Sequence, residues 1–353
     1  MNRRPLRAAV LSAGAWSRSS HLPTLASSPE VDLISVTSPE PGRAAATAAE
    51  FGAAHFSEHW EDALAREPDL VVVSSPPSVH EAQVVRALEA GAHVLVEKPF
   101  ALESASARRM HAAAERHGRA LLVGFGWTAA PLFLEVARIQ AAGLLGELEQ
   151  LNLHLAVNTR ALLSGGSDGG WAGASVSAPD TYTRPEISGG GTGAVSMSHQ
   201  LGLVRWLTGV PFSRVFATAF PPRSDIDLHM SSHFELANGA AASLTSASTH
   251  PSFTTPQWRM SWYGSRGQLT LDSARNELEL VTESGERRRS DPGSASGVYS
   301  PGAPTEALIR CGRGAAVPDG LGSALAVDVV AATDALYASA RSGTVVPVEQ
   351  GTP

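Results

Sequence analysis

The sequence contains very little cysteine and very little lysine. Cys311 is the one cysteine among 353 residues, which excludes an internal disulfide framework and is typical of a reducing compartment. Of the 27 Lys and Arg residues, only Lys98 is a lysine. An ammonium can lose its proton when it is desolvated and a guanidinium cannot, so Lys98 is a candidate for proton-transfer chemistry. The alternative is a lysine that extends its charge into solvent at a strand end.

Basic clusters and long apolar runs are missing as well. The net charge is −7 and the largest basic cluster is the triplet at residues 287–289, so we expect no nucleic-acid partner. The apolar run at residues 8–11 is too short for the core of a signal peptide, and no stretch approaches the length of a membrane span. The 12 histidines are scattered, and the pair His55 and His59 has no third ligand nearby, so we expect no metal site. These features predict a soluble cytoplasmic protein that does not bind membranes.

Apolar residues, glycine and proline are plentiful, as in a globular chain with many turns, and 353 residues are enough for two domains. In residues 1–124, short apolar runs alternate with helical patterns. The predicted strands are 7–12, 32–38, 70–74, 93–96 and 120–123, and the predicted helices are 17–26, 43–51, 60–66, 78–90 and 104–117. This alternation predicts a doubly wound Rossmann domain with a parallel sheet, which would bind a dinucleotide.

The pattern changes in residues 125–353, where strands follow one another without helices between them. The predicted strands are 147–157, 212–220, 226–236, 240–248, 257–263, 268–272, 277–281 and a short one near 345. The predicted helices are 131–142, one from the Gly-rich segment to about 207, and 321–339, and residues 284–305 are predicted to be a surface loop. We expect an α+β domain on an open, mostly antiparallel sheet.

The segment Val-Leu-Val-Glu-Lys-Pro-Phe at residues 94–100 combines a buried strand with charged residues. Proline fixes its own φ and biases the preceding residue away from helix, so Lys98 should lie extended at the carboxyl end of the strand. In open α/β sheets this is the end at which ligands bind. The segment therefore predicts a site at Glu97 and Lys98.

The turn after the first predicted strand reads Ser-Ala-Gly-Ala-Trp-Ser, where dinucleotide folds carry G-x-G-x-x-G. Only the middle glycine, Gly14, is present, at the position where the backbone approaches the pyrophosphate. Ser12, Gly14, Ala15 and Trp16 are therefore candidate cofactor-binding residues, and Ser17 is a candidate helix cap. A plain strand–turn–helix connection is the alternative.

The second predicted strand ends at Ser38, where NAD-binding folds usually carry an acidic residue for the ribose hydroxyls. Arg43 follows, and a hydroxyl with a guanidinium suits a 2′-phosphate. Glu40 is close enough in sequence to bind the ribose instead. The sequence therefore predicts a nicotinamide dinucleotide at Ser38 and Arg43, with NADP preferred over NAD.

Three segments together resemble one family. They are Ala-Gly-Ala-His-Val-Leu-Val-Glu-Lys-Pro at residues 90–99, Val-Val-Val-Ser-Ser-Pro-Pro-Ser-Val-His at residues 71–80, and the triplet Gly189-Gly190-Gly191 followed by His199. They are similar to the segments A-G-K-H-V-L-x-E-K-P, I-A-T-P-N-x-x-H and G-G-G-x-x-x-D-x-x-x-H of the Gfo/Idh/MocA family. This is the glucose–fructose oxidoreductase and inositol dehydrogenase type of NAD(P)-dependent oxidoreductase, and the resemblance covers nearly the whole chain.

The resemblance implies roles for individual residues. In the family the E-K-P lysine lies beside the nicotinamide, and the helix aspartate and histidine serve the substrate as acid/base groups. Cofactor binding is thereby implied for Ser75, Pro76, His80, Glu97 and Lys98, and catalysis and substrate binding for Lys98 and His199. The resemblance also implies a homodimer or homotetramer, paired through a sheet face that we expect to be apolar.

The chain departs from the family pattern at three places: Val195 replaces the helix aspartate, Gly202 replaces a further aspartate, and Gly126-Trp127-Thr128 replaces N-x-R. A valine cannot relay a proton. Either His199 works with Lys98 alone, or another residue supplies the missing group. The nearest candidates are Tyr182 as a catalytic acid and Asp180, Arg184 and Trp127 as substrate-binding residues, although residues 180–184 could equally be a solvent loop and His199 a core histidine.

Three functions are open at this stage. The first is an oxidoreductase that transfers hydride between the nicotinamide and a hydroxyl or keto carbon of a sugar, cyclitol or sugar-derived substrate. The second is a glycosidase in which bound NAD oxidises a sugar transiently to permit elimination. The third is a non-catalytic NADP-binding protein, suggested by the lost aspartate and opposed by the retained Lys98.

Overall fold

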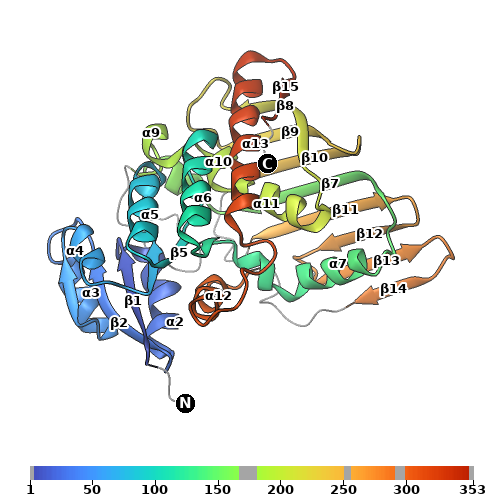
Figure 1. The fold of residues 1–353 in the computed structure, drawn as a ribbon. Coiled ribbons are helices and arrows are strands. Elements are labelled where there is room, and N and C mark those ends of the chain that lie inside the picture. Colours follow the sequence, from blue (N-terminus) through green and yellow to red (C-terminus); the bar gives the residue numbers. More distant parts are fainter. Residues whose placement is uncertain (1–3, 167–180, 250–255, 291–298, 350–353) are drawn as a thin grey trace.

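The computed structural model describes residues 4–166, 181–249, 256–290 and 299–349, which form two sheets with helices packed on them (Figure 1). The first sheet has the order β3-β2-β1-β4-β5-β6, and every neighbouring pair is parallel. Its strands are β1 (Leu6–Leu11), β2 (Val31–Thr37), β3 (His55–Ser57), β4 (Leu70–Val73), β5 (His93–Val96) and β6 (Leu121–Val123). The order reverses between β1 and β4, so their carboxyl ends form the switch point at which doubly wound folds bind ligands. The predicted Rossmann domain is confirmed.

Two helices of this domain span the predicted residues. They are α3 (Arg43–Phe51) and α6 (Ser104–His117). Each ends at a glycine of positive φ, 73° at Gly52 and 60° at Gly118, because glycine adopts this conformation without a clash at Cβ. The other helices after β2 are α4 (Glu61–Leu64), the 3-10 turn η1 (Pro77–Val79) and α5 (His80–Glu89).

The first helical segment differs from the prediction. It consists of α1 (Ala15–Ser19) and α2 (His21–Ser27). The predicted capping role of Ser17 is wrong, because α1 begins after Gly14 and Ser17 lies within it. The Ser17 hydroxyl instead donates to the carbonyl oxygens of Ser12 and Gly14, at 3.2 and 3.0 Å.

The second sheet has the order β14-β13-β12-β11-β7-β10-β9-β8-β15 within the described ranges. All its neighbouring pairs are antiparallel except β7 with β10, which confirms the predicted open, mostly antiparallel sheet. Its strands are β7 (Leu148–Val157), β8 (Phe212–Phe220), β9 (His229–Leu236), β10 (Ala241–Ser248), β11 (Gln257–Gly264), β12 (Gly267–Asp272), β13 (Glu277–Thr282), β14 (Arg287–Ser290) and β15 (Val346–Pro347).

Strand β14 lies where the sequence predicts a loop. Its arginines suggest a polar turn, yet Arg287 and Arg289 both form ion pairs with Glu279 on β13, at 3.8 and 3.4 Å. Opposite charges across antiparallel strands stabilise the pairing. Five other elements were also missed: the short edge strand β3, the 3-10 turn η2 (Gly126–Ala129), and the helices α8 (Arg160–Leu163), α9 (Pro185–Ser188) and α12 (Ala303–Gly312). Helix α12 packs against β4, β5 and α2, so this late part of the chain returns to the Rossmann sheet.

One face of the second sheet is covered by helices, which Figure 1 shows as α7 (Pro131–Ala141), α11 (Met197–Thr208) and α13 (Ser323–Ser342). By length and composition α13 could cross a membrane, so the expectation that no stretch approaches the length of a membrane span is wrong. Here it packs against β8, α6 and α11, and 56% of its apolar window is buried. It therefore serves as a core helix of this domain.

The opposite face of the sheet is polar. One row across six neighbouring strands consists of Thr270, Ser261, Asn152, Ser243, His233 and Phe216. Phe216 and Tyr263 are among the few large apolar side chains exposed there, at 38% and 40%. The expectation that this face is apolar is wrong, since hydroxyl, amide and imidazole groups occupy most of it.

Candidate functional site

Lys98 lies just after β5, at the carboxyl end of the Rossmann sheet, as the sequence predicts. Its Nζ donates to the main-chain carbonyl of Val195, at 3.5 Å. Val195 ends α10 (Thr192–Val195) in the second domain, so this contact joins the two domains. Burial lowers the pKa of the Lys98 ammonium, and the neighbouring carboxylate of Glu97 opposes that shift.

His199 lies in the first turn of α11, and only 4% of it is exposed. Its ring lies 5.8 Å from that of Phe125 and 5.7 Å from that of Tyr299. Burial, and next the Lys98 ammonium, lowers the pKa of His199 well below its ordinary value of 6.5. The imidazole is therefore neutral at pH 7 and has a lone pair that can accept a proton.

One narrow pocket brings Lys98 and His199 together, although they come from different domains. The rest of its described wall consists of Asn158, Thr159, Ser196, Leu155, Val157, Val195, Pro256 and Trp258. Its free volume of about 40 Å³ is well below the ~300–1,000 Å³ of typical ligand pockets. A sugar-sized ligand therefore requires some of these side chains to move.

The Gly-rich turn before α10 is a packing site. A Cβ at Gly190 would lie 2.4 Å from the Tyr337 hydroxyl, and one at Gly191 would lie 2.0 Å from the carbonyl oxygen of Asp227. The Asp227 carboxylate accepts hydrogen bonds from the Gly193 amide at 2.9 Å and the Tyr337 hydroxyl at 2.6 Å. The glycines admit these two residues, which fix the turn that carries Val195.

Sequence reasoning missed both Asp227 and Tyr337. Asp227 is fully buried, and burial raises the pKa of its carboxyl group, while the hydrogen bond from Tyr337 opposes that shift. The pattern gave no signal, because Asp227 falls at a polar position of the alternating segment 226–236, where an acidic residue with an exposed side chain is expected. Such a residue must find donors when it is buried.

The nucleotide loop keeps its shape with one glycine. Ser12, at the first position of the motif, has φ 72°, the left-handed conformation usually taken by glycine. Ser74, after β4, donates to the Ser12 carbonyl at 2.7 Å. A Cβ at Gly14 would meet nothing within 4 Å, so the space beside it is open. Ser12, Gly14, Ala15 and Trp16 thus lie at the switch point, where a pyrophosphate would be held.

The residues predicted to select the cofactor lie together after β2. Ser38 is buried and its hydroxyl accepts a hydrogen bond from the Glu40 amide at 3.4 Å. Arg43 and Glu40 form an ion pair. The guanidinium expected to bind a 2′-phosphate is therefore held by a carboxylate.

His80 connects the loop after β4, which contains Ser75, to the loop after β5. The Ser75 hydroxyl donates to Gln83 at 2.6 Å. His80 is fully buried, with Nε2 2.7 Å from the Ser75 carbonyl and Nδ1 3.1 Å from the Phe100 carbonyl. Burial lowers the pKa of His80. The side chain of His80 thus links the loop of Ser75 and Pro76 to the residue after Pro99.

The Glu97 carboxylate is buried between the nucleotide loop and α2. Its Oε1 accepts hydrogen bonds from Trp16 Nε1 at 2.9 Å and contacts His21 Nε2 at 3.0 Å. His21 Nδ1 lies 2.8 Å from the Thr305 hydroxyl. Tyr299 donates its hydroxyl to the Gly124 carbonyl at 3.0 Å. Sequence reasoning missed His21, Tyr299 and Thr305, since neither periodicity nor spacing relates α2 to α12.

The other predicted substrate residues lie apart from the pocket wall. Trp127 is fully buried and stacks on Phe125, with ring centroids 5.0 Å apart. Arg184 is exposed and pairs with Glu186 at 2.7 Å. Burial, and next the charge of Glu97, raises the pKa of Tyr182 to about 12. Asp180 lies outside the described residues.

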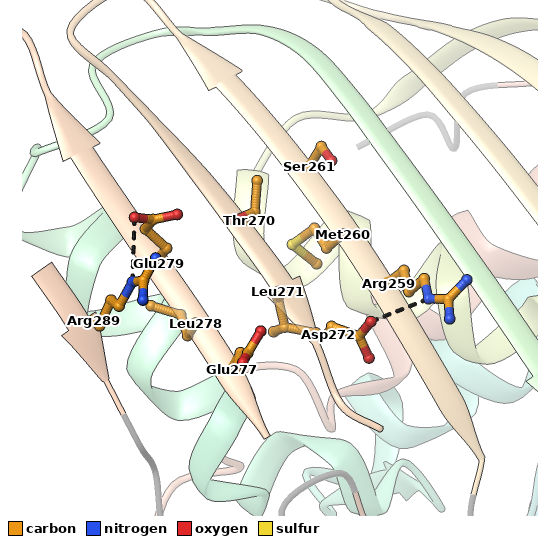
Figure 2. Close-up of a pocket in the computed structure, with 10 residues that line it drawn as sticks. All are labelled: Arg259, Met260, Ser261, Thr270, Leu271, Asp272, Glu277, Leu278, Glu279 and Arg289. Atoms are coloured by element: carbon orange, nitrogen blue, oxygen red, sulfur yellow. Dashed lines mark hydrogen bonds and ion pairs between the residues drawn. The ribbon is translucent and has the colours of Figure 1, made fainter. Parts of the chain in front are cut away.

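A second hollow, of about 310 Å³, lies on the polar face of the sheet over β11–β14 (Figure 2). Its charged side chains include two ion pairs, Arg259 with Asp272 at 3.2 Å and Arg289 with Glu279 at 3.4 Å. It shares no lining residue with the pocket of Lys98 and His199. None of the predicted site residues lines this hollow, so we place the candidate active site in the pocket of Lys98 and His199.

Comparisons with known proteins identify the family of this chain. Residues 6–125 match the model of the oxidoreductase family with an NAD-binding Rossmann fold, and residues 133–270 match the GFO/IDH/MocA C-terminal domain. The chain belongs to the Gfo/Idh/MocA family. Its first domain is therefore of the NAD-binding Rossmann type that this oxidoreductase family carries.

Among curated relatives in this family, the chain is similar to D-glucoside 3-dehydrogenase of Escherichia coli (strain K12), with 30% identity over 60% of this chain and 56% of the relative. It is also similar to dTDP-3,4-didehydro-2,6-dideoxy-alpha-D-glucose 3-reductase of Streptomyces violaceoruber, with 28% identity over 88% of this chain and 87% of the relative. The chain thus spans just over half of the first relative and most of the second.

Several solved structures share the fold. A levoglucosan dehydrogenase in complex with NADH and levoglucosan superimposes with a TM-score of 0.81 over 98% of this chain and 100% of that chain, at 19% identity. GenD2 from gentamicin A biosynthesis, in complex with NAD, superimposes with a TM-score of 0.76 over 99% and 97%, at 24% identity. At these identities the likeness establishes the fold alone.

Proposed function

We propose that this protein transfers hydride between the nicotinamide of a bound dinucleotide and a hydroxyl or keto carbon of a sugar, cyclitol or sugar-derived substrate. One observation carries the proposal: Lys98 from the Rossmann domain and a neutral, buried His199 from the second domain line the same pocket. The names of the relatives, a glucoside dehydrogenase and a deoxysugar reductase, support the substrate class.

In this proposal Lys98 and His199 have different roles at the substrate oxygen. When bound, the dinucleotide supplies the hydride donor or acceptor. The Lys98 ammonium, held by the Val195 carbonyl, orients the oxygen and offsets the charge that develops on it. The neutral His199 accepts the carbinol proton in oxidation, and the imidazolium returns it in reduction. Tyr182 stays a second candidate acid, but it does not line this pocket, and its raised pKa makes the phenol a weaker proton donor than an ordinary tyrosine.

Two parts of the first domain could hold a dinucleotide: the loop of Gly14 and the residues that follow β2. Gly14 leaves space for the backbone approach of a pyrophosphate, with Ala15 and Trp16 beside it. We propose that Ser38 and Arg43 bind the adenosine ribose end and that NADP is preferred. The preference should be modest, because a 2′-phosphate must compete with Glu40 for the Arg43 guanidinium.

The proposal also assigns a role to each domain and an oligomeric state to the protein. Residues 1–124 bind the dinucleotide, and residues 125–353 bind substrate and mediate association into a homodimer or homotetramer through the polar sheet face. Phe216 and Tyr263 give that face two exposed aromatic anchors. Light scattering at micromolar concentration tests this, and a monomer would contradict it. The single buried Cys311 supports a cytoplasmic location.

The decisive experiment measures nicotinamide absorbance with a panel of neutral sugars, cyclitols and keto-sugars, for wild type and Lys98→Met. Hydride transfer that Lys98→Met abolishes supports the proposal. Wild-type turnover of glycosides without added cofactor would indicate the glycosidase instead. Tight dinucleotide binding with no turnover of any substrate would indicate a non-catalytic binding protein.

A further inference from the structure

A buried chain of polar groups links α12 to the nucleotide loop. The Thr305 hydroxyl lies 2.8 Å from His21 Nδ1, and His21 Nε2 lies 3.0 Å from Glu97 Oε1. The same carboxylate oxygen accepts the indole N–H of Trp16 at 2.9 Å. Thr305 and His21 are fully buried, and Glu97 is 7% exposed. Trp16 of α1 and His21 of α2 thus meet at the Glu97 carboxylate, and Thr305 of α12 joins through His21.

The main chain around Glu97 also contacts both oxygens of its carboxylate. Its Oε2 accepts the main-chain amide of Lys98, at 3.2 Å. A Cβ at Gly124, just after β6, would lie 2.4 Å from Oε1 and 3.0 Å from Oε2, so the chain closes over both oxygens. Burial disfavours the charge, yet the hydrogen bond and charge of His21, with Lys98 and Trp16, lower the pKa of Glu97 overall. The group is a carboxylate at neutral pH, with its acceptor sites used inside the protein.

Trp16 donates a hydrogen bond to this carboxylate from a short helix. It lies in α1, which is only five residues long, and a helix of that length has little stability of its own. Its ring meets Tyr299 edge-on, with centroids 6.2 Å apart. The hydrogen bond to Glu97 therefore ties the nucleotide loop to the strand end that carries Lys98.

We propose that Glu97 is a positioning residue of the nucleotide loop, holding Trp16 in place and held in turn by His21 and Thr305. Glu97 then acts on the dinucleotide through Trp16 and does not contact it. The inference rests on the proposed binding of a dinucleotide, but not on the identity of the substrate. It gives α12 a function in cofactor affinity, although α12 follows most of the second domain in sequence.

The test uses matched substitutions at buried threonines. Thr305→Val removes the hydroxyl that holds His21 and keeps the shape, whereas Thr305→Ser keeps the hydroxyl. Thr47→Val is the control, since the buried Thr47 hydroxyl has no hydrogen-bond partner among the described residues. We expect Thr305→Val to weaken NADPH and NADH binding about 5- to 10-fold, as for the loss of one buried hydrogen bond. Thr305→Ser should restore binding, and Thr47→Val should leave it unchanged.

A double-mutant cycle separates positioning from direct contact. If Glu97 acts through Trp16, Glu97→Gln and Trp16→Phe each raise the dissociation constant of the dinucleotide. The dissociation constant of the double variant is then no higher than the higher of the two single-variant values. If Glu97 contacts the dinucleotide itself, the two effects multiply, and the proposal is overturned. The KM for substrate at saturating dinucleotide should stay unchanged in Thr305→Val. A general loss of structure would change this KM as well.

The binding assay needs no turnover, so the outcomes separate the two proposals. A wild-type protein that binds the dinucleotide but reduces nothing would refute only the proposed reaction. Unchanged binding in both Thr305→Val and Trp16→Phe would refute only the positioning role. No dinucleotide binding by wild type would refute both.

Discussion

The ammonium of Lys98 lies 3.5 Å from the main-chain carbonyl of Val195, the residue that stands where the family resemblance places an aspartate. A carbonyl dipole attracts an ammonium but carries no net charge. The pKa of Lys98 therefore stays lowered by burial, with only Glu97 opposing the shift. The contact involves the main chain of residue 195, so it does not replace the negative charge of an aspartate side chain, and this suggests the first experiment.

Val195→Asp should raise the pKa of Lys98. A carboxylate within a few ångströms favours the charged form of an ammonium by about 1–3 pKa units. The limb of the pH–rate profile that reports Lys98 should move to higher pH by a similar amount. Val195→Asn is the control, because it has nearly the same shape without the charge. An identical profile for both variants would contradict this account of Lys98.

Lys98→Met should abolish activity and raise thermal stability. The roles assigned to the ammonium are each worth about 10²–10³-fold in rate. Because the folded-state pKa of Lys98 is lowered, the unfolded chain binds the proton more tightly, and the charge destabilises the folded state at neutral pH. Lys98→Arg should be nearly as inactive, since a planar, permanently charged fork cannot replace the ammonium. The melting temperature and the single-turnover rate check both expectations.

His199→Asn should reduce the rate less than Lys98→Met and remove an acidic limb from the pH profile. The pKa of His199 is lowered in the folded protein. Its contribution to stability is therefore complete above the unfolded value of about 6.5 and decreases as the pH falls toward the folded value. Urea unfolding of wild type should show a falling free energy of unfolding below that pH. The slope should be smaller in His199→Asn, with a remainder from the buried His80.

Glu40→Gln and Arg43→Ala should change cofactor selectivity in opposite directions. Glu40→Gln releases the Arg43 guanidinium from its ion pair, so binding of NADPH should strengthen relative to NADH. Arg43→Ala should weaken NADPH selectively, by several-fold at low salt and less at high salt. Titrations of both nucleotides at matched ionic strength measure the ratio. A wild-type preference for NADH that neither substitution alters would show that these residues do not select the cofactor.

Much of the fold follows from local patterns. The strand–helix alternation of the first domain and the consecutive strands of the second need only apolar periodicity and glycine stops, as at Gly52 and Gly118. Strand β14 was missed because its polarity hides the cross-strand pairing with Glu279, which exists only once β13 lies beside it. Helix α12 was missed because its partners, β4 and β5, are distant in the chain.

The sequence by itself determined the chemistry that is available: a sole lysine at a strand end, a histidine after a Gly-rich turn, and a nucleotide loop with one glycine. Tertiary structure decided where these groups act. It brought Lys98 and His199 into one pocket, turned Glu97 toward His21, and placed Trp127 in the core and Arg184 at the surface. The reason is physical, because desolvation and hydrogen-bond partners depend on contacts between segments far apart in sequence.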